Sequence, residues 1–204
     1  VCSPWVGVLT HLEGLRSPPQ HAMAIGRVRW QGEPLVAVVA ESRALAEDAL
    51  ELIDVDYKEL PPAVDMEKAL DAGEEVIHDA YENNLCWERN VNQGDVETAF
   101  AASDVVIEEE YRFGRHTGVT LESRSIVADF DAGEDTLTLY HSTQAPHMKQ
   151  ALFAKHLDLE EHKIRIICKD VGGAFGLKAH AYGDEFATVA MSMILKRPVK
   201  YVAD

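Results

Sequence analysis

A cluster of three glycines places the strongest constraint on the fold of this chain. Gly172, Gly173 and Gly176 lie within five residues, between an apolar, β-rich run at 163–168 and an amphipathic run at 183–196. Glycine adopts positive φ angles without strain and lets backbone N–H groups approach a ligand closely. The pattern therefore predicts a strand, a tight loop and a helix in succession, with a loop able to cradle an anionic or oxo ligand.

The cluster does not match either of the common phosphate-binding loops. A P-loop requires Gly-Lys followed by Ser or Thr, whereas Leu177 follows Gly176 and Ala179 follows Lys178. The dinucleotide-binding pattern Gly-x-Gly-x-x-Gly requires a spacing that these glycines lack. Taken alone, such a cluster serves a structural turn as often as a ligand, so both interpretations stay open.

Apolar periodicity predicts strands and helices in both halves of the chain, which makes the fold class α+β, a mixed α/β arrangement. The strands expected in the first half are 27–30, 34–40 and 54–60, the first two forming a hairpin. The helices expected there are one capped by Ser42 and one at 65–73. A polar, Asn-rich stretch then predicts a boundary near Asn84, which divides the chain into domains at residues 1–84 and 85–204.

The second half is expected to alternate strands and helices around the glycine loop. Alternation at Val105, Ile107, Glu109, Tyr111 and Phe113 predicts one face of a long strand. The other elements expected, in chain order, are a helix at 95–102, a hairpin of 126–130 and 136–141, a helix from Pro146, a strand at 163–168, a helix at 183–196 and a strand at 198–203. The side chains that the 183–196 helix is expected to bury are Phe186, Val189, Ala190, Met193 and Ile194.

Composition limits the partners of the chain. A formal net charge of −16 leaves no basic patch to neutralise phosphates, so no nucleic acid is expected. No apolar run approaches the roughly 20 residues of a membrane-spanning helix, the longest being 35–40. The three cysteines are far apart and in no Cys-x-x-Cys spacing, which indicates a reducing compartment, the cytoplasm by default. Neither the cysteines nor His141, His147, His156 and His162 have the spacing of a metal site, so no metal ligated by this chain is expected.

Several short motifs occur in an order that carries more information than any one of them. The loop reads Gly-Gly-Ala-Phe-Gly-Leu-Lys at 172–178, after Leu-Glu-Ser-Arg at 121–124 and Ser-Thr-Gln-Ala-Pro-His at 142–147. Tyr-Gly-Asp-Glu at 182–185 and Arg-Pro-Val-Lys at 197–200 follow. In this order the motifs resemble the molybdopterin-binding large subunits of the xanthine dehydrogenase and aldehyde oxidase family.

The resemblance extends to the first half and implies a domain organisation. Residues 29–40 and 55–60 are similar to the small α/β hammerhead domain of that family. The chain is then expected to be an N-terminal fragment, with a hammerhead domain followed by the first part of a molybdopterin-binding domain. In the family the carboxylate that acts as base lies later in the subunit. The resemblance therefore implies no catalytic residue in this chain and no activity of the chain alone.

The resemblance assigns the cofactor-binding role to the glycine loop. The backbone of Gly172, Gly173, Ala174, Phe175 and Gly176 is expected to lie beside the molybdenum, where its amides could stabilise oxo or phosphate oxygens. The Phe175 ring is expected to wall the substrate channel, with simple burial in the core as the alternative.

Five further positions follow from the same resemblance. His116 takes the place of a family Gln that binds an oxygen on molybdenum, although a surface histidine would give the same sequence. Gln144 is expected to line the cofactor pocket or to bond a neighbouring loop. Glu122 and Arg124 belong to the Leu-Glu-Ser-Arg segment that matches the family, and the alternative is that they form a structural ion pair on one strand face. Xanthine-oxidising members have a Glu where this chain has Ala179, which argues against a purine substrate.

The resemblance implies a molybdenum-dependent oxidoreductase that oxidises an aldehyde or N-heterocyclic small molecule with oxygen derived from water. Its cofactor would be molybdopterin, with iron–sulfur clusters and FAD on partner subunits or domains, and the assembly would be a homodimer of heteromers. The alternative from another class is a non-catalytic module that docks subunits. A hydrolase is disfavoured because the chain has no Gly-x-Ser-x-Gly elbow.

Overall fold

The computed structural model describes residue 4, residues 12–71 and residues 73–204. Helices and one mixed sheet confirm the predicted α+β class. The elements, in chain order, are α1 (Arg43–Leu50), α2 (Val96–Ala101), β1 (Ser125–Asp131), β2 (Thr136–His141), α3 (Pro146–Leu157), the 3-10 helix η1 (Glu161–Lys163), β3 (Ile164–Ile167), α4 (Gly183–Leu195) and β4 (Val199–Val202).

The four strands form a sheet in the order β3-β2-β1-β4. The predicted hairpin is confirmed, since β1 and β2 pair antiparallel with Ala128 opposite Leu139. Its turn is held by the Asp131 carboxylate, which accepts hydrogen bonds from the backbone N–H groups of Gly133 and Glu134 at 2.8 and 3.2 Å. β4 pairs antiparallel with β1, whereas β3 runs parallel to β2 and is reached through α3, as a parallel pair requires.

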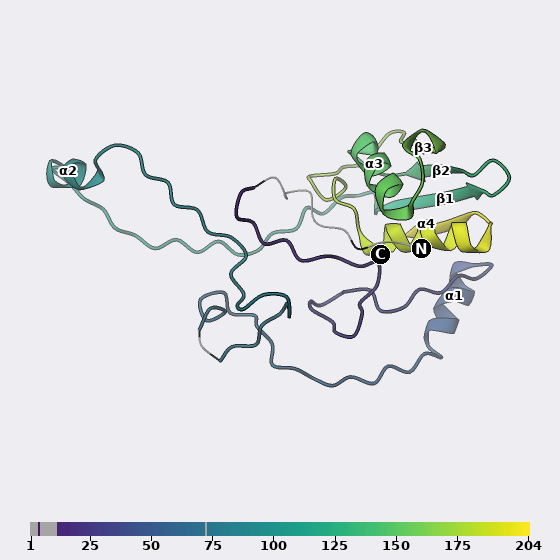
Figure 1. Ribbon diagram of the computed structural model, residues 1–204, viewed down its shortest axis with the longest axis horizontal. Helices are drawn as coiled ribbons and strands as arrows, with labels where there is room; N and C mark the ends of the chain where they lie inside the picture. Colours follow the sequence, from purple (N-terminus) through teal and green to yellow (C-terminus); the bar gives the residue numbers. More distant parts are fainter. Residues whose placement is uncertain (1–3, 5–11, 72) are drawn as a thin grey trace.

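Helices α3 and α4 pack on one face of this sheet (Figure 1). Because strand side chains alternate between faces, Ile126, Ala128, Leu137 and Leu139 all point toward the helices and are buried. Phe153 of α3 and Phe186 of α4 meet edge to face with ring centroids 5.0 Å apart, and both are completely buried. These residues form the apolar core of the second half.

The ends of the second-half helices follow local signals in the sequence. Pro146 opens α3, where its missing N–H is no loss, and Asp158 ends it in the left-handed region. α4 begins after Tyr182, whose backbone N–H donates to the Glu185 carboxylate at 3.3 Å, and ends at left-handed Lys196. Of the side chains expected to be buried by α4, Ile194 is 57% exposed, so that prediction was wrong. Met193 is only partly buried against the core.

The strands predicted in the first half are not formed among the described residues. Residues 27–30, 34–40 and 54–60 belong to no ladder, and α1 is the regular element that appears there, capped by Ser42 as predicted. The helix predicted at 65–73 is reduced to a hydrogen-bonded turn, with residue 72 outside the described residues. An extended segment becomes a strand only when a neighbour satisfies its backbone groups, and periodicity carries no information about that neighbour.

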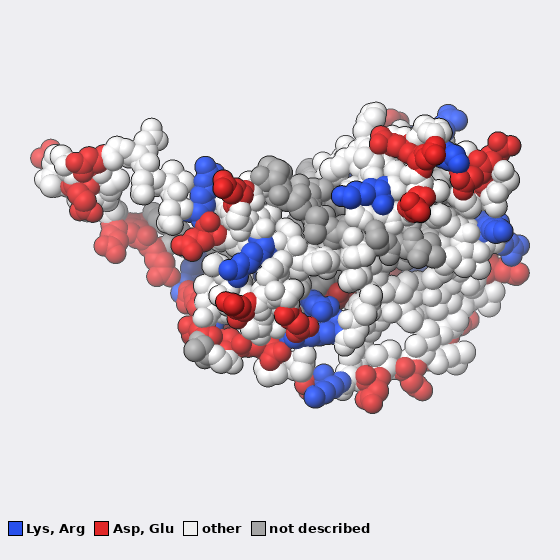
Figure 2. All heavy atoms as spheres, in the orientation of Figure 1, with Lys and Arg blue, Asp and Glu red and all other residues white. Residues whose placement is uncertain are grey.

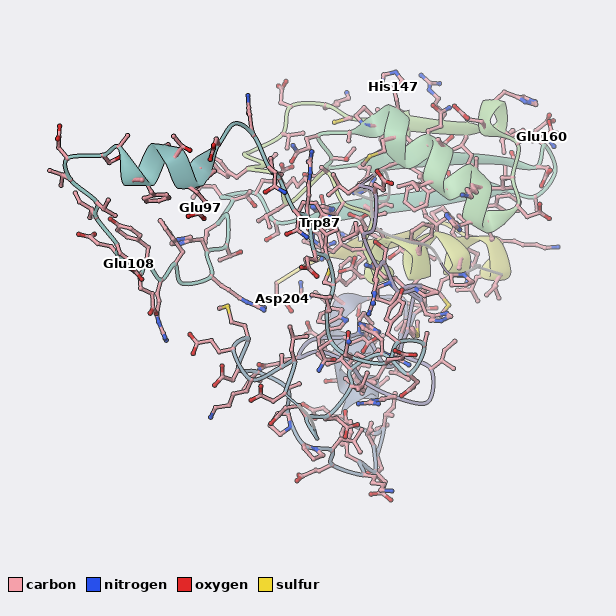
Figure 3. All side chains as sticks on the ribbon, turned by 60° about the vertical axis from the view of Figure 1, so that its left-hand side comes forward. Trp87, Glu97, Glu108, His147, Glu160 and Asp204 are labelled. Atoms are coloured by element: carbon pink, nitrogen blue, oxygen red, sulfur yellow. The ribbon has the colours of Figure 1, made fainter. Side chains whose placement is uncertain are left out.

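Residues 88–117, here called the α2 arm, lead away from the sheet to α2 and back (Figure 1). The helix predicted at 95–102 is confirmed as α2, which is capped by Asp95, whose carboxylate accepts from the Thr98 N–H at 3.0 Å. The long strand predicted at 105–113 is absent, and its alternate apolar side chains are exposed, from 74% at Val105 to 83% at Phe113. Acidic side chains are prominent on this arm in Figure 2, and Figure 3 shows Glu97 and Glu108 on it.

Among the described residues, contacts at Gly183 and at Asp204 join the first half to the sheet region. The Ala22 carbonyl lies so close to Gly183, at the start of α4, that a Cβ there would be 2.7 Å from its oxygen. Arg43 of α1 forms an ion pair with Asp204, which follows β4. None of the helices in the described part of the chain is long and apolar enough to cross a membrane.

The Phe153–Phe186 contact provides a test of the core. Phe186→Ala is expected to lower the free energy of unfolding by about 3–5 kcal/mol, because it removes a completely buried ring and leaves a cavity. Phe100→Ala on the exposed face of α2 is the control, with an expected change within about 0.5 kcal/mol. Urea denaturation measures both, and equal losses would contradict the placement of the core.

Candidate functional site

The glycine loop connects β3 to α4 and adopts an unusual backbone conformation. Gly173 and Gly176 have φ angles of +96° and +87°, and Phe175 has a φ of 47°. The left-handed region costs a non-glycine residue about 1–3 kcal/mol, so Phe175 is a position where the surrounding structure holds the backbone in place. The Leu177 N–H donates to the Ala174 carbonyl at 2.8 Å, which tightens the turn.

The first glycine of the loop is required by a close contact with another segment. A Cβ on Gly172 would lie 2.6 Å from the Cβ of Glu122, closer than any side chain tolerates. At the same place, the Glu122 N–H donates to the Gly172 carbonyl at 3.2 Å. The segment before β1 and the start of the loop are therefore in direct contact.

Glu122 binds both ends of the loop through one oxygen atom. Its Oε2 accepts from the Gly172 N–H at 2.7 Å, from Lys178 Nζ at 2.8 Å and from the Ser142 hydroxyl at 2.9 Å. Lys178 is completely buried. The hydrogen bond from Lys178, followed by that from Gly172, holds the pKa of Glu122 below its usual range. We call these four residues, Glu122, Ser142, Gly172 and Lys178, the Glu122 clasp.

The ion pair considered between Glu122 and Arg124 is not formed, because each side chain has a different partner. Arg124 makes a two-point contact with Asp184, at 2.8 and 2.6 Å, and its guanidinium lies 3.8 Å from the centre of the Tyr182 ring. Such a bidentate, stacked arginine fixes the orientation of the start of α4. The Tyr182 hydroxyl in turn donates to the Leu177 carbonyl at 2.6 Å, which links α4 back to the glycine loop.

A second set of charges lies buried beneath the site. Lys149 of α3, with no exposed surface, donates to both oxygens of Glu185 of α4 at 2.9 and 2.8 Å. The His141 ring of β2 lies 3.1 Å from the same carboxylate. Burial lowers the pKa of His141. Because an ionised carboxylate only accepts hydrogen bonds, the bond to Glu185 requires a proton on Nε2. This Lys149–Glu185–His141 network ties two helices and a strand together.

The residues predicted to bind the cofactor are only partly brought together. Phe175 is 76% exposed, so the alternative that it is a core residue is wrong. Gly118 lies against it, since a Cβ on Gly118 would be 2.9 Å from the Phe175 Cβ. His116 and Gln144 are both exposed, and among the described residues neither side chain is hydrogen-bonded to the loop. Gln144 approaches it only through its backbone N–H, which donates to the Lys178 carbonyl at 3.3 Å.

The loop borders a shallow depression of about 330 Å³ on the sheet face opposite the helices. Its walls include Glu122 and Ser142 of the clasp, Val171 of the loop and Tyr140 and Lys200 of the sheet. Within the described part of the chain, no group of three or more His, Cys, Asp or Glu side chains could hold a metal ion. His147, one of the histidines counted above, is exposed and points outward from α3 (Figure 3).

Comparison with protein families decides the relationship of the chain. The model described as the molybdopterin cofactor-binding domain matches residues 77–204, and that described as the aldehyde oxidase and xanthine dehydrogenase a/b hammerhead domain matches residues 8–61. The chain belongs to the xanthine dehydrogenase and aldehyde oxidase family. Molybdopterin is thereby confirmed as the cofactor of the domain family that includes residues 77–204, and the division near Asn84 stays a prediction.

Individual members of the family match nearly all of the chain. The nicotine 6-hydroxylase large subunit of Paenarthrobacter nicotinovorans is 36% identical over 94% of the chain, and the carbon monoxide dehydrogenase large chain of Afipia carboxidovorans is 31% identical over 96%. The crystal structure of quinoline 2-oxidoreductase from Pseudomonas putida 86 superposes over 100% of the chain with a TM-score of 0.92 and 33% identity. The matches cover 23%, 26% and 26% of these proteins, so the chain spans about a quarter of their length.

Neither the Glu122 clasp nor the Lys149–Glu185–His141 network was predicted from the sequence, although some of their residues lie in the motifs described above. Glu122 and Lys178 lie in two of the recognised motifs but are 56 residues apart. Glu185 lies in the Tyr-Gly-Asp-Glu motif, yet its partner Lys149 sits within an ordinary helical pattern. A lysine on the apolar face of a helix was the available signal, since such a residue is seldom buried without a counter-charge.

The stability of the chain is expected to depend strongly on the partners in the buried Lys149–Glu185–His141 network. Lys149→Met is expected to lower the free energy of unfolding by about 3–5 kcal/mol, because it removes the buried cation that contacts both Glu185 oxygens and leaves the carboxylate only the longer, 3.5 Å contact with Arg124. The double variant Lys149→Met with Glu185→Gln should lose less than the sum of the two single variants, since no lone charge remains. Chemical denaturation of the three variants measures this coupling, and strictly additive losses would contradict it.

Proposed function

We propose that this chain supplies the glycine loop on which a molybdenum-dependent oxidoreductase holds molybdopterin. The single observation that carries the proposal is the backbone of the loop, left-handed at Gly173, Phe175 and Gly176 and bound at both ends by Glu122. Consecutive backbone N–H groups in such turns form concave sites for anions and oxo groups. Membership of a molybdopterin-binding family supports the same assignment.

The residues present fit such a cofactor. A Cβ on Gly176 would meet nothing within 4 Å, so the space in front of this glycine is open. The loop therefore offers backbone donors beside empty space, without a side chain that would fill it. Phe175, with most of its ring exposed, can close one side of that space. When bound, molybdopterin supplies the two-electron redox chemistry, whereas this chain binds and orients it.

The roles of His116 and Gln144 are part of the proposal. His116 lies two residues before Gly118, which contacts Phe175, so it belongs to the segment that borders the loop. There it would donate a hydrogen bond to a cofactor oxygen. Gln144 would line the same pocket from the other side, because its backbone is already bound to Lys178.

The proposed substrate is an aldehyde or an N-heterocyclic small molecule, oxidised with oxygen from water. The relatives named for nicotine and quinoline support a heterocycle, and Ala179 at the position of a family Glu argues against a purine. Iron–sulfur clusters and FAD on partner subunits or domains would accept the electrons. The complete cytoplasmic assembly would be a homodimer of heteromers, and this chain would be inactive without the rest of its subunit.

The competing function, a subunit-docking module without a cofactor, makes a different prediction for the glycines. A docking module needs the shape of the domain but does not need open space and free N–H groups at Gly176. Substitutions of Gly176 and Gly94 distinguish these functions. Gly94, in the α2 arm, resembles Gly176 in its positive φ and in the open space around it. It has a φ of +73°, and a Cβ on it would also meet nothing within 4 Å.

The test is the molybdenum and pterin content of the complete protein that carries this chain, purified from a molybdate-fed, cofactor-competent host. Near-stoichiometric molybdenum is expected in the wild type and in Gly94→Ala, whereas Gly176→Ala is expected to lose most of it. Both substitutions place a side chain at a positive φ with open space around it, so a difference between them reports the cofactor. A wild type without molybdenum, or equal contents in both variants, would contradict the proposed site.

A further inference from the structure

We propose that Glu122 and Lys178 are positioning residues, whose ion pair closes the base of the glycine loop and thereby determines how tightly molybdopterin is held. The inference deepens the proposed function and rests on it. It concerns side chains that need not touch the cofactor, since both lie at the base of the loop, away from Gly176.

The geometry of the Glu122 clasp closes the loop at its base. Residues 172 and 178 are its first and last residues, and both donate to the same oxygen atom, Glu122 Oε2, at 2.7 and 2.8 Å. The five residues between them therefore form a closed turn whose ends cannot separate without breaking a charged hydrogen bond. Hydrogen bonds to a carboxylate are about twice as strong as neutral ones, so this closure resists opening.

The two partners are themselves fixed in place. Lys178 is completely buried, and its carbonyl accepts from the Thr143 hydroxyl at 2.9 Å as well as from the Gln144 N–H. Glu122 is held by the Ser142 hydroxyl and by the contact of its own Cβ with Gly172. Because neither partner can follow a moving loop, the clasp sets the position of the loop relative to the sheet.

The placement of the clasp separates it from the apolar core. Its four residues are polar or glycine, and none of them belongs to the cluster of buried apolar side chains between the sheet and the helices. Glu122 keeps 37% of its side chain exposed at the mouth of the depression beside the loop. Loss of the clasp is therefore expected to loosen residues 171–177 while leaving the paired strands β1 and β2 intact.

The left-handed residues are the ones that the clasp holds. Phe175 and Gly176 lie midway between the two clasped ends, and Phe175 adopts its strained backbone without burial of its ring. A conformation of that kind persists only where the surroundings fix it. Without the clasp, the backbone N–H groups of the loop should sample several directions, and a cofactor would lose their simultaneous hydrogen bonds.

The first measurement is hydrogen exchange on the complete protein without cofactor, produced in a host that does not make molybdopterin. Glu122→Gln and Lys178→Met are expected to speed exchange of the amides in residues 171–177 roughly tenfold, with no change in β1 and β2. Lys163→Met is the matched control, because it breaks an ion pair of similar length, 2.7 Å to Asp135, at the far end of the sheet. It should leave the loop unchanged.

The second measurement is molybdenum retained by the loaded protein after a fixed incubation and gel filtration. Faster loss is expected in Glu122→Gln and Lys178→Met than in the wild type or Lys163→Met. If Lys178→Met does not fold, Ser142→Ala removes one donor of the clasp without leaving a buried charge, and a smaller loss of the same kind is expected.

The outcomes separate this inference from the function on which it rests. Unchanged exchange of the loop, or equal acceleration in the loop and the strands, would overturn the clasp as a positioning device. A looser loop with molybdenum retained as in the wild type would overturn its connection to the cofactor. A wild-type protein that contains no molybdenum would instead overturn the proposed function, whereas the exchange experiment would still report on the clasp.

Discussion

The carboxylate of Glu185 is the point on which the arrangement of the second half depends. It is 2% exposed, and in that environment an ionised carboxylate is stable only if several donors surround it. Lys149 of α3, His141 of β2 and the N–H of Tyr182 provide them, together with a longer contact of 3.5 Å from Arg124. Burial alone would raise the pKa of Glu185, but the hydrogen bond from His141 and the charge of Lys149 hold it below its usual range. One side chain thus fixes α4 relative to the sheet and to α3.

From this point a chain of contacts leads to the loop. The start of α4 carries Asp184, which orients Arg124 just before β1, and Tyr182, whose hydroxyl bonds the Leu177 carbonyl. Lys178 then reaches Glu122, which bonds the first glycine of the loop. The loop is rich in glycine, yet charged contacts hold it at both ends. A cofactor site made of backbone N–H groups needs such support, because its donors have no rotamers of their own to adjust.

The sequence predicted the regular elements around the loop and the family, and it failed where structure depends on distant partners. The hairpin of β1 and β2, the helices opened by Pro146 and capped by Asp95, and the strand–loop–helix order follow from local signals. The strands expected at 54–60 and 105–113 were wrong, because alternation reports an extended backbone but not the neighbour that would pair with it. The spacing of Glu122 and Arg124 suggested an ion pair between them, whereas in the fold Glu122 pairs with Lys178, 56 residues away. The exposure of Phe175 likewise depends on the left-handed turn, which residue type does not encode.

A high-resolution structure of the complete, molybdenum-loaded protein would show directly whether the glycine loop holds the cofactor. Cofactor oxygens are expected within about 2.7–3.2 Å of backbone nitrogens in residues 174–176, with Glu122 still bound to Lys178 and to the Gly172 N–H. A cofactor bound elsewhere on the protein, with no atom in hydrogen-bond distance of the loop, would contradict it.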